Sequence, residues 1–422
     1  MDNIYEKLLE YVITLKVIDT HEHLPAWESE REKETDVVKE YFTHYFNRDI
    51  LSAGIERTDY NKALDITLPI YERWKLLEPY WNVCRKTGYG RSLDITAKAL
   101  YGVDRIDGES IEQLDEAFKK SIKPGWYKYV LKDLCNIETS ILDSERLDVD
   151  RELYTVSLHT NYFVWPRTFG QILEIGNNAG VSVCSFSTWL EAVHKTLETA
   201  ISSDVKIFKS ALAYSRSIHY PRVTHQEAEE SFNRLFSNRH IPDWLDDSVY
   251  PEMAFQNYMM HYILEFANRN QITFQFHTGI HEGSGNLLHN SNPSLLSNLF
   301  LEYPGVIFDL FHISFPFQEE AGALCKTFPN VYLDMCWSHI ISPAVSVRTL
   351  YEWLDSVPYN KICAFGGDYC FVDAVYGHLH LARENICKAL TLKIEDKVFD
   401  FDEACAVADM LLYHNPKKIF KL

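Results

Sequence analysis

The second half of the chain alternates short apolar segments with amphipathic ones, and this rhythm restricts the fold more than any other feature. The short segments are rich in Val, Ile, Phe and Tyr, whereas the longer ones repeat their apolar residues with the spacing of a helix. Apolar strands that alternate with helices indicate a parallel sheet covered by helices. The strand candidates after residue 135 are 137–142, 153–158, 181–186, 205–210, 271–277, 305–312, 330–335 and 361–366.

An earlier apolar segment, residues 17–24 (VIDTHEHL), adds a strand near the start of the chain. Eight or nine strands are enough to close an eight-stranded barrel, and 181–186 is the surplus segment because its pattern is the least regular. A chain of 422 residues is long enough for one large α/β barrel with an insertion. Amphipathic helices are expected at 3–15, 188–202, 225–237, 252–269, 293–302, 318–327, 346–355, 375–390 and 402–413.

Residues 25–132 have a different character from the rest of the chain. Aromatic residues such as Trp74, Trp81 and Tyr89 recur there without the alternation of a strand, and acidic residues are interleaved throughout. This pattern predicts several helices inserted after the first strand. The predicted fold class is therefore α/β: a (β/α)8 TIM-type barrel of residues 1–24 and 133–422, with 25–132 as a helical insertion that covers the barrel mouth as a lid.

The composition excludes several classes of function. A hydrophobic content of 46% allows a large core, and a net charge of −19 disfavours binding to nucleic acid or to a membrane surface. The nine cysteines include no CxxC pair, which indicates reduced thiols. No segment resembles a signal peptide or has the apolar length of a membrane span. We expect a cytoplasmic protein that acts on a small molecule; the sequence leaves assembly into a homo-oligomer open.

The first strand ends in two histidines, His21 and His23, separated by one residue. Alternate residues of a strand point to the same face, so the two imidazoles lie about 6.6 Å apart along one side. That spacing allows both rings to bind one metal ion at about 2.0–2.1 Å. Taken alone, the pair is also compatible with two unrelated surface histidines near a strand end.

Polar residues end several of the later strands as well. His277, His312 and Asp368 stand at or just after the ends of strands 271–277, 305–312 and 361–366. Lys209 lies near the end of strand 205–210. Barrel enzymes place their active sites at the carboxyl ends of the strands, so these side chains are expected to converge. Imidazoles with a carboxylate suit one Zn²⁺ ion, with Mn, Fe or Ni as alternatives.

Each of these later residues also has a structural interpretation. His277 could be a hydrogen-bonded core histidine, His312 could lie beside a metal without touching it, and Asp368 could form a turn after its two glycines. Lys209 could bridge two metals after carboxylation, bind an anionic substrate, or pair with a carboxylate.

The remaining histidines are weaker candidates for the site, and the motifs of several other enzyme classes are missing from the sequence. His378 and His380 lie in a predicted helix, where a spacing of two residues points them in nearly opposite directions. His281 follows His277 by four residues in a loop, where it could contact a substrate or simply lie at the surface. The sequence has no HExxH, no P-loop and no GxGxxG after a strand, so zincin, NTPase and dinucleotide-binding interpretations lack their motifs.

These residues resemble the amidohydrolase superfamily, which has an HxH motif ending strand 1, histidines ending strands 5 and 6, and an aspartate ending strand 8. The closer resemblance is to the amidohydrolase-related branch that includes uronate isomerases and the nodulin-related domains fused to glutamine synthetase. It spans nearly the whole chain. One difference is that uronate isomerases follow the strand 8 aspartate closely with an arginine, whereas residues 369–371 here are YCF. The matching stretches are 80–81 (YW), 87–90 (TGYG), 100–102 (LYG), 208–214 (FKSALAY), 276–279 (FHTG), 292–296 (NPSLL), 330–334 (NVYLD), 365–368 (FGGD) and 415–422 (NPKKIFKL).

The resemblance implies a metal-dependent hydrolase that acts on a small amide, ester or lactone bearing a carboxylate. Asp368 is then expected to act as general base and general acid, and His312 to hydrogen-bond the substrate carbonyl. The expected substrate-binding residues are Lys209, Arg216 and His281. The expected metal ligands are His21, His23, His277 and Asp368.

Three alternatives stay open at this stage. The same metal site could serve a uronate-isomerase-like reaction on a sugar acid, or a non-oxidative decarboxylation. The chain could also be a metal-stabilised binding protein without catalysis.

Overall fold

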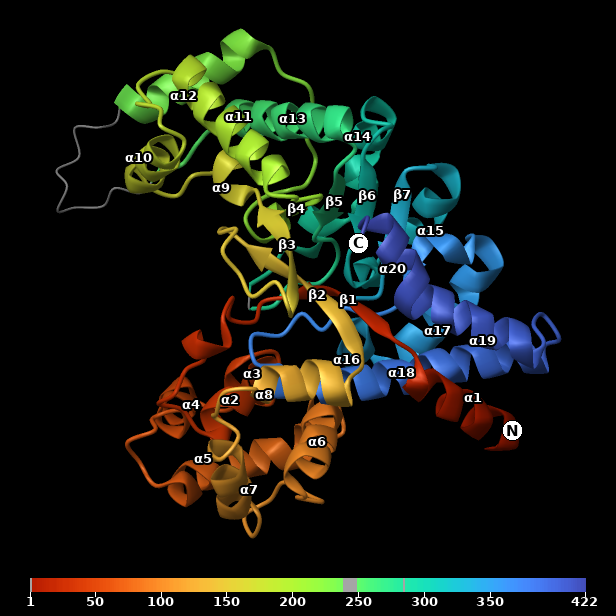
Figure 1. The fold of residues 1–422 in the computed structure, drawn as a ribbon. Coiled ribbons are helices and arrows are strands. Elements are labelled where there is room, and N and C mark those ends of the chain that lie inside the picture. The colour runs from red at the N-terminus through yellow and green to blue at the C-terminus, as the bar shows by residue number, and fades with distance from the viewer. Residues whose placement is uncertain (1, 238–248, 284) are drawn as a thin grey trace.

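The computed structural model describes residues 2–237, 249–283 and 285–422. Its centre is a sheet of eight parallel strands in sequence order, curled into a nearly closed barrel with helices around it (Figure 1). This confirms the predicted (β/α)8 fold. The strands are β1 (Val17–Glu22), β2 (Ile137–Ser144), β3 (Tyr154–His159), β4 (Ile207–Ser210), β5 (Thr273–Phe276), β6 (Ile307–Leu310), β7 (Val331–Asp334) and β8 (Ile362–Cys363).

Residues 181–186 do not form a strand, so the barrel has eight strands rather than nine. Ser185 instead begins helix α11 (Phe186–Ser202) with a capping box, in which its hydroxyl accepts a hydrogen bond from the backbone N–H of Thr188. The Thr188 hydroxyl in turn accepts from the backbone N–H of Ser185 at 2.9 Å. A Ser-x-x-Thr cap satisfies two of the free amides at a helix start, and here it commits the chain to a helix.

The remaining helices cover the outside of the barrel. The predicted helices 225–237 and 318–327 agree with α12 and α15, and the others agree to within a few residues at each end. They are α1 (Asp2–Thr14), α9 (Asn161–Val164), α10 (Phe169–Asn178), α12 (His225–Ser237), α13 (Met253–Asn270), α14 (Ser297–Glu302), α15 (Gln318–Thr327), α16 (Ser338–Ile341), α17 (Pro343–Ser356), α18 (Val372–Glu395), α19 (Phe401–Asp409) and α20 (Asn415–Ile419).

The segment between β1 and β2 contains helices and loops but no strand. These helices gather on one side of the barrel, coloured red to light orange in Figure 1. A buried aspartate at the start of α18, Asp373, accepts hydrogen bonds from Trp126 Nε1 and Tyr101 Oη, both at 2.6 Å, and ties the segment to the barrel. The helices are α2 (Val37–Thr43), α3 (Phe46–Ser52), α4 (Arg57–Ala63), α5 (Ile70–Cys84), α6 (Gly88–Tyr101), α7 (Ile111–Lys119) and α8 (Trp126–Lys128).

The C-terminal residues close the amino end of the barrel. Ile141, Ile207 and Cys363, from β2, β4 and β8, form a buried cluster with Ile419 and Phe420. Alternate strands of such barrels contribute their inward side chains to a common layer, which explains the even-numbered set. The opposite end of the barrel is left for polar residues.

The barrel closes where β8 meets β1, and this seam is built differently from the others. The two strands form no continuous ladder in the described chain, and β8 is only two residues long. Three backbone hydrogen bonds bridge the seam: Thr20 N–H to Phe365 O (3.1 Å), Asp368 N–H to His21 O (2.8 Å), and His23 N–H to Tyr369 O (3.0 Å). The predicted metal ligands thus lie on both sides of the seam.

All nine cysteines are free thiols, which agrees with the absence of a predicted disulfide framework. Among the described helices, none has both the length and the apolar character of a membrane span.

Candidate active site

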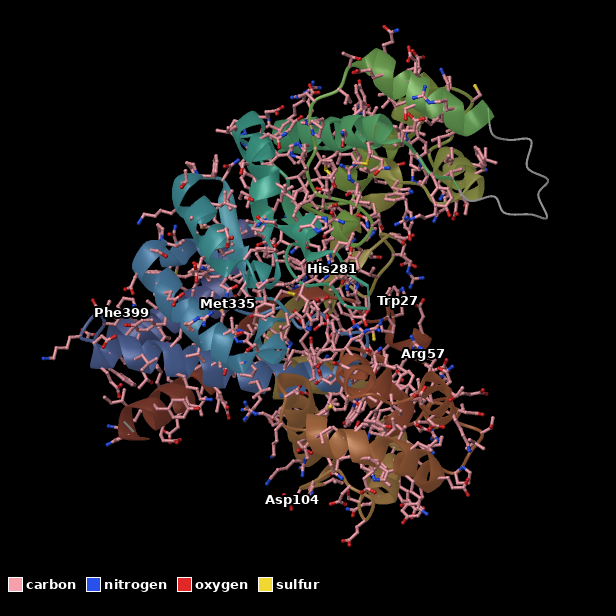
Figure 2. All side chains as sticks on the ribbon, turned by 180° about the vertical axis from the view of Figure 1, so that it is seen from behind. Trp27, Arg57, Asp104, His281, Met335 and Phe399 are labelled. Atoms are coloured by element: carbon pink, nitrogen blue, oxygen red, sulfur yellow. The ribbon has the colours of Figure 1, made fainter. Side chains whose placement is uncertain are left out.

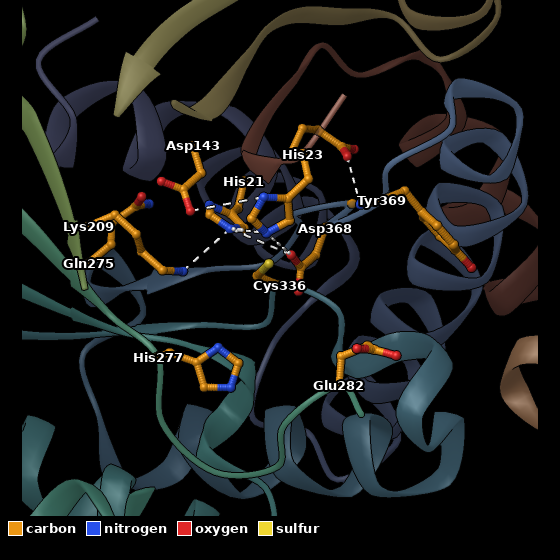
Figure 3. A network of polar contacts seen from close by, with 12 residues as sticks. His21, His23, Asp143, Lys209, Gln275, His277, Glu282, Cys336, Asp368 and Tyr369 are labelled. Atoms are coloured by element: carbon orange, nitrogen blue, oxygen red, sulfur yellow. Dashed lines mark hydrogen bonds and ion pairs between the residues drawn. The ribbon is translucent and has the colours of Figure 1, made fainter. Parts of the chain in front are cut away.

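Side chains at the carboxyl ends of the strands surround a cavity of about 280 Å³. Asp143 and Glu282 lie on opposite sides of the group formed by His21, His23 and Asp368 (Figure 3). The predicted site residues that converge with His277 at one end of the barrel are therefore His21, His23, Lys209 and Asp368. The lining comprises His21, His23, His44, Tyr45, Asp143, His159, Lys209, Ala211, Tyr214, His277, Glu282 and Asp368.

Three ligand atoms converge closely enough to hold one metal ion. His21 Nε2 and His23 Nε2 are 3.2 Å apart, and Asp368 Oδ1 lies 3.5 Å from the first and 3.2 Å from the second. Two atoms bound to one tetrahedral zinc at about 2.1 Å are about 3.4 Å apart. The three separations match that value, so the residues present fit a divalent ion. The buried His21 Nδ1 has no hydrogen-bond partner in the described structure.

Burial and the neighbouring charged groups set the protonation states of Asp368 and His21. Burial raises the pKa of Asp368, but the hydrogen bond to His23 and the neighbouring His21 and His312 hold it well below its ordinary value. Burial, followed by the charge of Lys209, lowers the pKa of His21 well below its ordinary value. Asp368 is therefore an anion and His21 a neutral imidazole at neutral pH, the forms that bind a metal.

Lys209 is buried beneath the cavity. Its Nζ lies 3.4 Å from His21 Nε2 and 3.6 Å from the centre of the Phe311 ring. Burial lowers the pKa of Lys209 from its ordinary value.

His277 and His312 are adjacent, but the structure does not place either in the ligand triangle. His312 Nε2 is 3.0 Å from His277 Nδ1, while His277 Nε2 is 2.9 Å from Ile280 O and His312 Nδ1 is 3.1 Å from Cys336 O. Two neutral rings carry two N–H groups for these three contacts, and both outer acceptors are carbonyl oxygens. One contact therefore lacks its proton unless the pair carries a positive charge.

This arrangement changes the roles expected for the pair. His277 lines the cavity, but its Nδ1 faces His312 Nε2, so it is not one of the three ligands of the triangle. His312 does not belong to the lining and cannot contact a substrate carbonyl there. Its Nε2 lies 3.9 Å from Asp368 Oδ2, so it supports Asp368 from behind. Potential ligand atoms lie within 4.8 Å of one another in two groups, one of His312, Cys336 and Asp368 and the other of His21, His23 and Asp143.

Arg216 lies away from the cavity, which corrects its expected role. It follows Tyr214 in sequence, but the chain turns outward and its guanidinium stacks on the Tyr220 ring, 4.3 Å from the ring centre. Its nitrogens donate to Gln256 Oε1, Asn257 Oδ1 and the carbonyls of residues 217 and 219. With its donors used inside the protein, Arg216 is not available to bind a substrate.

His281 lies one layer behind His277, with the two rings stacked at a centre-to-centre distance of 5.1 Å. It lines a neighbouring pocket of about 790 Å³ rather than the cavity itself. Arg57, on the helical segment, lines the same pocket, so His281 stands at the junction between that segment and the barrel (Figure 2). Burial lowers the pKa of His281 to about 4.

An ion pair at the ends of β2 and β3 was missed by the sequence analysis. His159 Nδ1 is 3.0 Å from Asp143 Oδ1 and 3.1 Å from its Oδ2, and both residues line the cavity. Asp143 Oδ2 also lies 4.0 Å from His23 Nδ1. The same rule that found His277 applies here, because each residue comes directly after a predicted strand, at 137–142 and at 153–158.

The helical segment supplies further cavity residues, His44 and Tyr45, between α2 and α3. Tyr45 donates a hydrogen bond from its hydroxyl to the backbone carbonyl of Asp368 at 2.6 Å. Burial lowers the pKa of His44 to about 4. No sequence signal marks these residues, because they reach the barrel only through tertiary packing.

Three loops at this end of the barrel contain strained backbone. His312, Trp337 and Asp368, which follow β6, β7 and β8, have φ values of 63°, 63° and 58°. Side chains other than glycine adopt this left-handed region at a cost, and such residues cluster at functional sites. The strained residues thus include the candidate ligand Asp368 and His312, which lies behind it.

Comparisons with known proteins show what this chain is similar to. The amidohydrolase family model matches residues 223–422. The protein fluG of Emericella nidulans is 24% identical over 252 residues, which cover 56% of this chain and 29% of fluG. This chain therefore spans less than a third of the length of that relative. The sequence of residues 223–422 is therefore similar to the amidohydrolase family.

Solved structures share the fold over nearly the whole chain. A uronate isomerase of Thermotoga maritima is 16% identical with a TM-score of 0.79, covering 99% of this chain and 97% of its own. The glucuronate isomerase of Caulobacter crescentus is 18% identical, with a TM-score of 0.78 and coverage of 99% and 94%. A Lactobacillus casei protein that carries the description metal-dependent hydrolase is 17% identical, with a TM-score of 0.68 and coverage of 98% and 97%. The match to the amidohydrolase family model, together with the groups of potential ligand atoms, supports an enzyme with a divalent metal ion.

Proposed function

We propose that this protein is a metal-dependent hydrolase that acts on a small amide, ester or lactone. The observation that carries the proposal is the triangle of His21 Nε2, His23 Nε2 and Asp368 Oδ1, with sides of 3.2, 3.2 and 3.5 Å. Two imidazoles and one carboxylate suit Zn²⁺, with Mn, Fe or Ni as alternatives. A bound ion of this kind polarises a carbonyl group and makes water more acidic.

In this mechanism, Asp368 is the residue that moves the proton. Its lowered pKa keeps it ionised, so it can accept a proton from the attacking water and later donate it to the leaving group. His312 lies behind this carboxyl group, with its Nε2 3.9 Å from Asp368 Oδ2. The hydrogen bond from Tyr45 holds the backbone of Asp368 in place during the reaction.

The Asp143–His159 pair provides a second polar contact for the substrate. Because Nδ1 of His159 bonds to Asp143, its Nε2 is the nitrogen left to interact with a ligand in the cavity. A carboxylate that fixes one ring nitrogen orients the other, as in other histidine-based sites. We assign to His159 the orientation of the substrate group that lies away from Asp368.

The charges around the cavity do not favour a substrate carboxylate. The lining contains three carboxylates, Asp143, Glu282 and Asp368, against one ammonium, Lys209. Lys209 already contacts His21, and Arg216 points elsewhere. We therefore propose a small carbonyl compound without the carboxylate expected from the sequence.

An isomerase acting on a sugar acid is the second candidate, and the whole-chain likeness to uronate isomerases supports it. Against it stands the residue that follows the metal ligand. Tyr369 is 2% exposed and packs between the rings of Tyr45 and Phe371, so this position offers no cationic group to a sugar carboxylate.

The two candidates are separated by assaying zinc-loaded protein on a panel of amides, esters and lactones, with glucuronate and galacturonate in parallel. The hydrolase predicts acid release from the panel and no ketose from the sugar acids, whereas ketose formation without hydrolysis would establish the isomerase. His21→Ala is expected to lose both bound metal and activity. Full metal retention by His21→Ala would contradict the proposed site.

A further inference from the structure

Glu22 stands between the two metal-binding histidines in sequence, yet its side chain serves another purpose. It is fully buried and does not line the cavity. Its Oε2 accepts a hydrogen bond from the backbone N–H of Tyr369 at 2.8 Å. This bond joins β1 to the loop that follows β8, and Tyr369 is the residue directly after the candidate ligand Asp368.

Asp19 makes the corresponding bond on the other side of the ligand. Its Oδ1 accepts from the backbone N–H of Gly367 at 2.9 Å. Between these two anchors, the N–H of Asp368 donates to the carbonyl of His21 at 2.8 Å. Three successive amides of the loop are therefore fixed to β1, and the one in the middle belongs to a residue with a strained φ of 58°.

The Glu22 carboxyl group lies so close to the loop that residue 367 has no room for a side chain. A Cβ atom built on Gly367 would lie 1.8 Å from Glu22 Oε1. Glycine is thus required by the carboxyl group that reaches across the seam, as expected where backbone and another group approach closely. Figure 3 shows Asp368 and Tyr369 beside His23 at this seam.

We propose that Glu22, assisted by Asp19, is a positioning residue that holds Asp368 at the distance from His21 and His23 that a metal ion requires. Ligands fixed before the ion arrives bind it more tightly than ligands that must be ordered on binding. The residue between the two histidines is therefore part of the site rather than a spacer. This inference rests on the proposed function, because it concerns the same metal centre.

The experiment compares zinc affinities of metal-stripped full-length proteins by titration against a chromophoric chelator. Glu22→Ala removes the acceptor and is expected to weaken zinc binding about 10- to 100-fold. Glu22→Gln keeps an oxygen acceptor for the Tyr369 amide and is expected to stay within a few-fold of the wild type. The amide of glutamine has nearly the same size and shape as the carboxyl group, and its oxygen can accept the hydrogen bond from Tyr369.

The matched control is Asp309→Asn, which changes another fully buried carboxyl inside the barrel. Asp309 accepts a hydrogen bond from Gln275, and in the described structure no hydrogen bond joins it to the loop at 367–369, so this variant is expected to bind zinc like the wild type. Hydrogen exchange of the amides at 367–369 gives a second readout, and it is expected to be faster in Glu22→Ala and unchanged in Asp309→Asn.

The outcomes separate this inference from the proposed function. Wild-type affinity in a folded Glu22→Ala protein would overturn the inference while leaving the metal site intact. An absence of zinc binding by the wild type itself would overturn the proposed function and the inference with it. If Glu22→Ala does not fold, Glu22→Asp takes its place. The aspartate side chain is shorter by one methylene group, so its carboxyl group no longer reaches the Tyr369 amide.

Discussion

At the scale of single residues, His23 sets how metal binding depends on pH. Burial lowers its pKa, but its hydrogen bond to Asp368 and the charges of Asp368 and Asp143 raise the pKa above its ordinary value of 6.5. The metal-binding form is the neutral one, so protons compete with the ion as pH falls through this raised pKa. His21, with its lowered pKa, stays neutral throughout.

We therefore predict that zinc affinity declines as the pH falls, and that the decline begins above the ordinary histidine pKa of 6.5. Asp143→Asn removes one of the charges that raise the pKa of His23, so its affinity should begin to fall at a lower pH. Competition titrations with a chelator at several pH values measure both effects. Equal zinc affinities at pH 8 and pH 6 in the wild type would contradict the assigned role of His23.

The sequence located site residues where a strand end made their position predictable. His21, His23 and Asp368 were found because strand ends meet at one rim of a parallel barrel. Asp143 and His159 obey the same rule but lie one residue beyond the predicted strand ends. Arg216 shows the limit of reasoning from nearness in sequence, because the loop after β4 carries it outward to Gln256 and Asn257.

At the scale of elements, strand and helix patterns were read correctly wherever they were long. The error at 181–186 arose because a short apolar run cannot be assigned from periodicity alone, and the Ser185 cap decided the outcome locally. The helical character predicted for residues 25–132 agrees with the helices found between β1 and β2. What the pattern could not provide was the docking of these helices on the barrel, because docking depends on a few specific contacts.

The contact at Asp373 makes this docking testable. Asp373→Ala leaves Trp126 Nε1 and Tyr101 Oη without their acceptor and removes the partner of Arg31, whose Nη2 is 3.5 Å away. Removing one member of a buried polar network costs about 3 kcal/mol, and we expect a loss of that size in the free energy of unfolding. Chemical denaturation followed by tryptophan fluorescence measures it.

The control for that prediction is Asp104→Ala on the same helical segment. Asp104 is paired with Lys98 at the surface, where ion pairs contribute little, so its removal is expected to leave the unfolding midpoint unchanged. Equal midpoints for Asp373→Ala and the wild type would show that the docking of the segment does not depend on Asp373.

At the scale of the whole molecule, the candidate metal centre coincides with the seam at which the barrel closes. β8 is two residues long, and β1 is joined to it by three backbone hydrogen bonds and by the carboxyl groups of Asp19 and Glu22. Two of the candidate ligands come from β1 and the third follows β8. An ion bound there closes the barrel as well as the active site.

Binding that closes the seam should stabilise the native protein, because a ligand that binds only the folded state raises its stability. The gain is about 2.7 kcal/mol at a free zinc concentration 100 times the dissociation constant. Thermal unfolding with and without zinc measures it, and His21→Ala should show no such increase. An equal increase in His21→Ala would place the stabilising ion elsewhere.

The central claim is that His21, His23 and Asp368 bind one divalent ion across this seam. The most direct test is anomalous scattering from crystals of the zinc-loaded protein, recorded on both sides of the zinc absorption edge. The account predicts one strong peak within bonding distance of His21 Nε2, His23 Nε2 and an oxygen of Asp368. A fully loaded protein whose zinc peak lies away from these three side chains would contradict it.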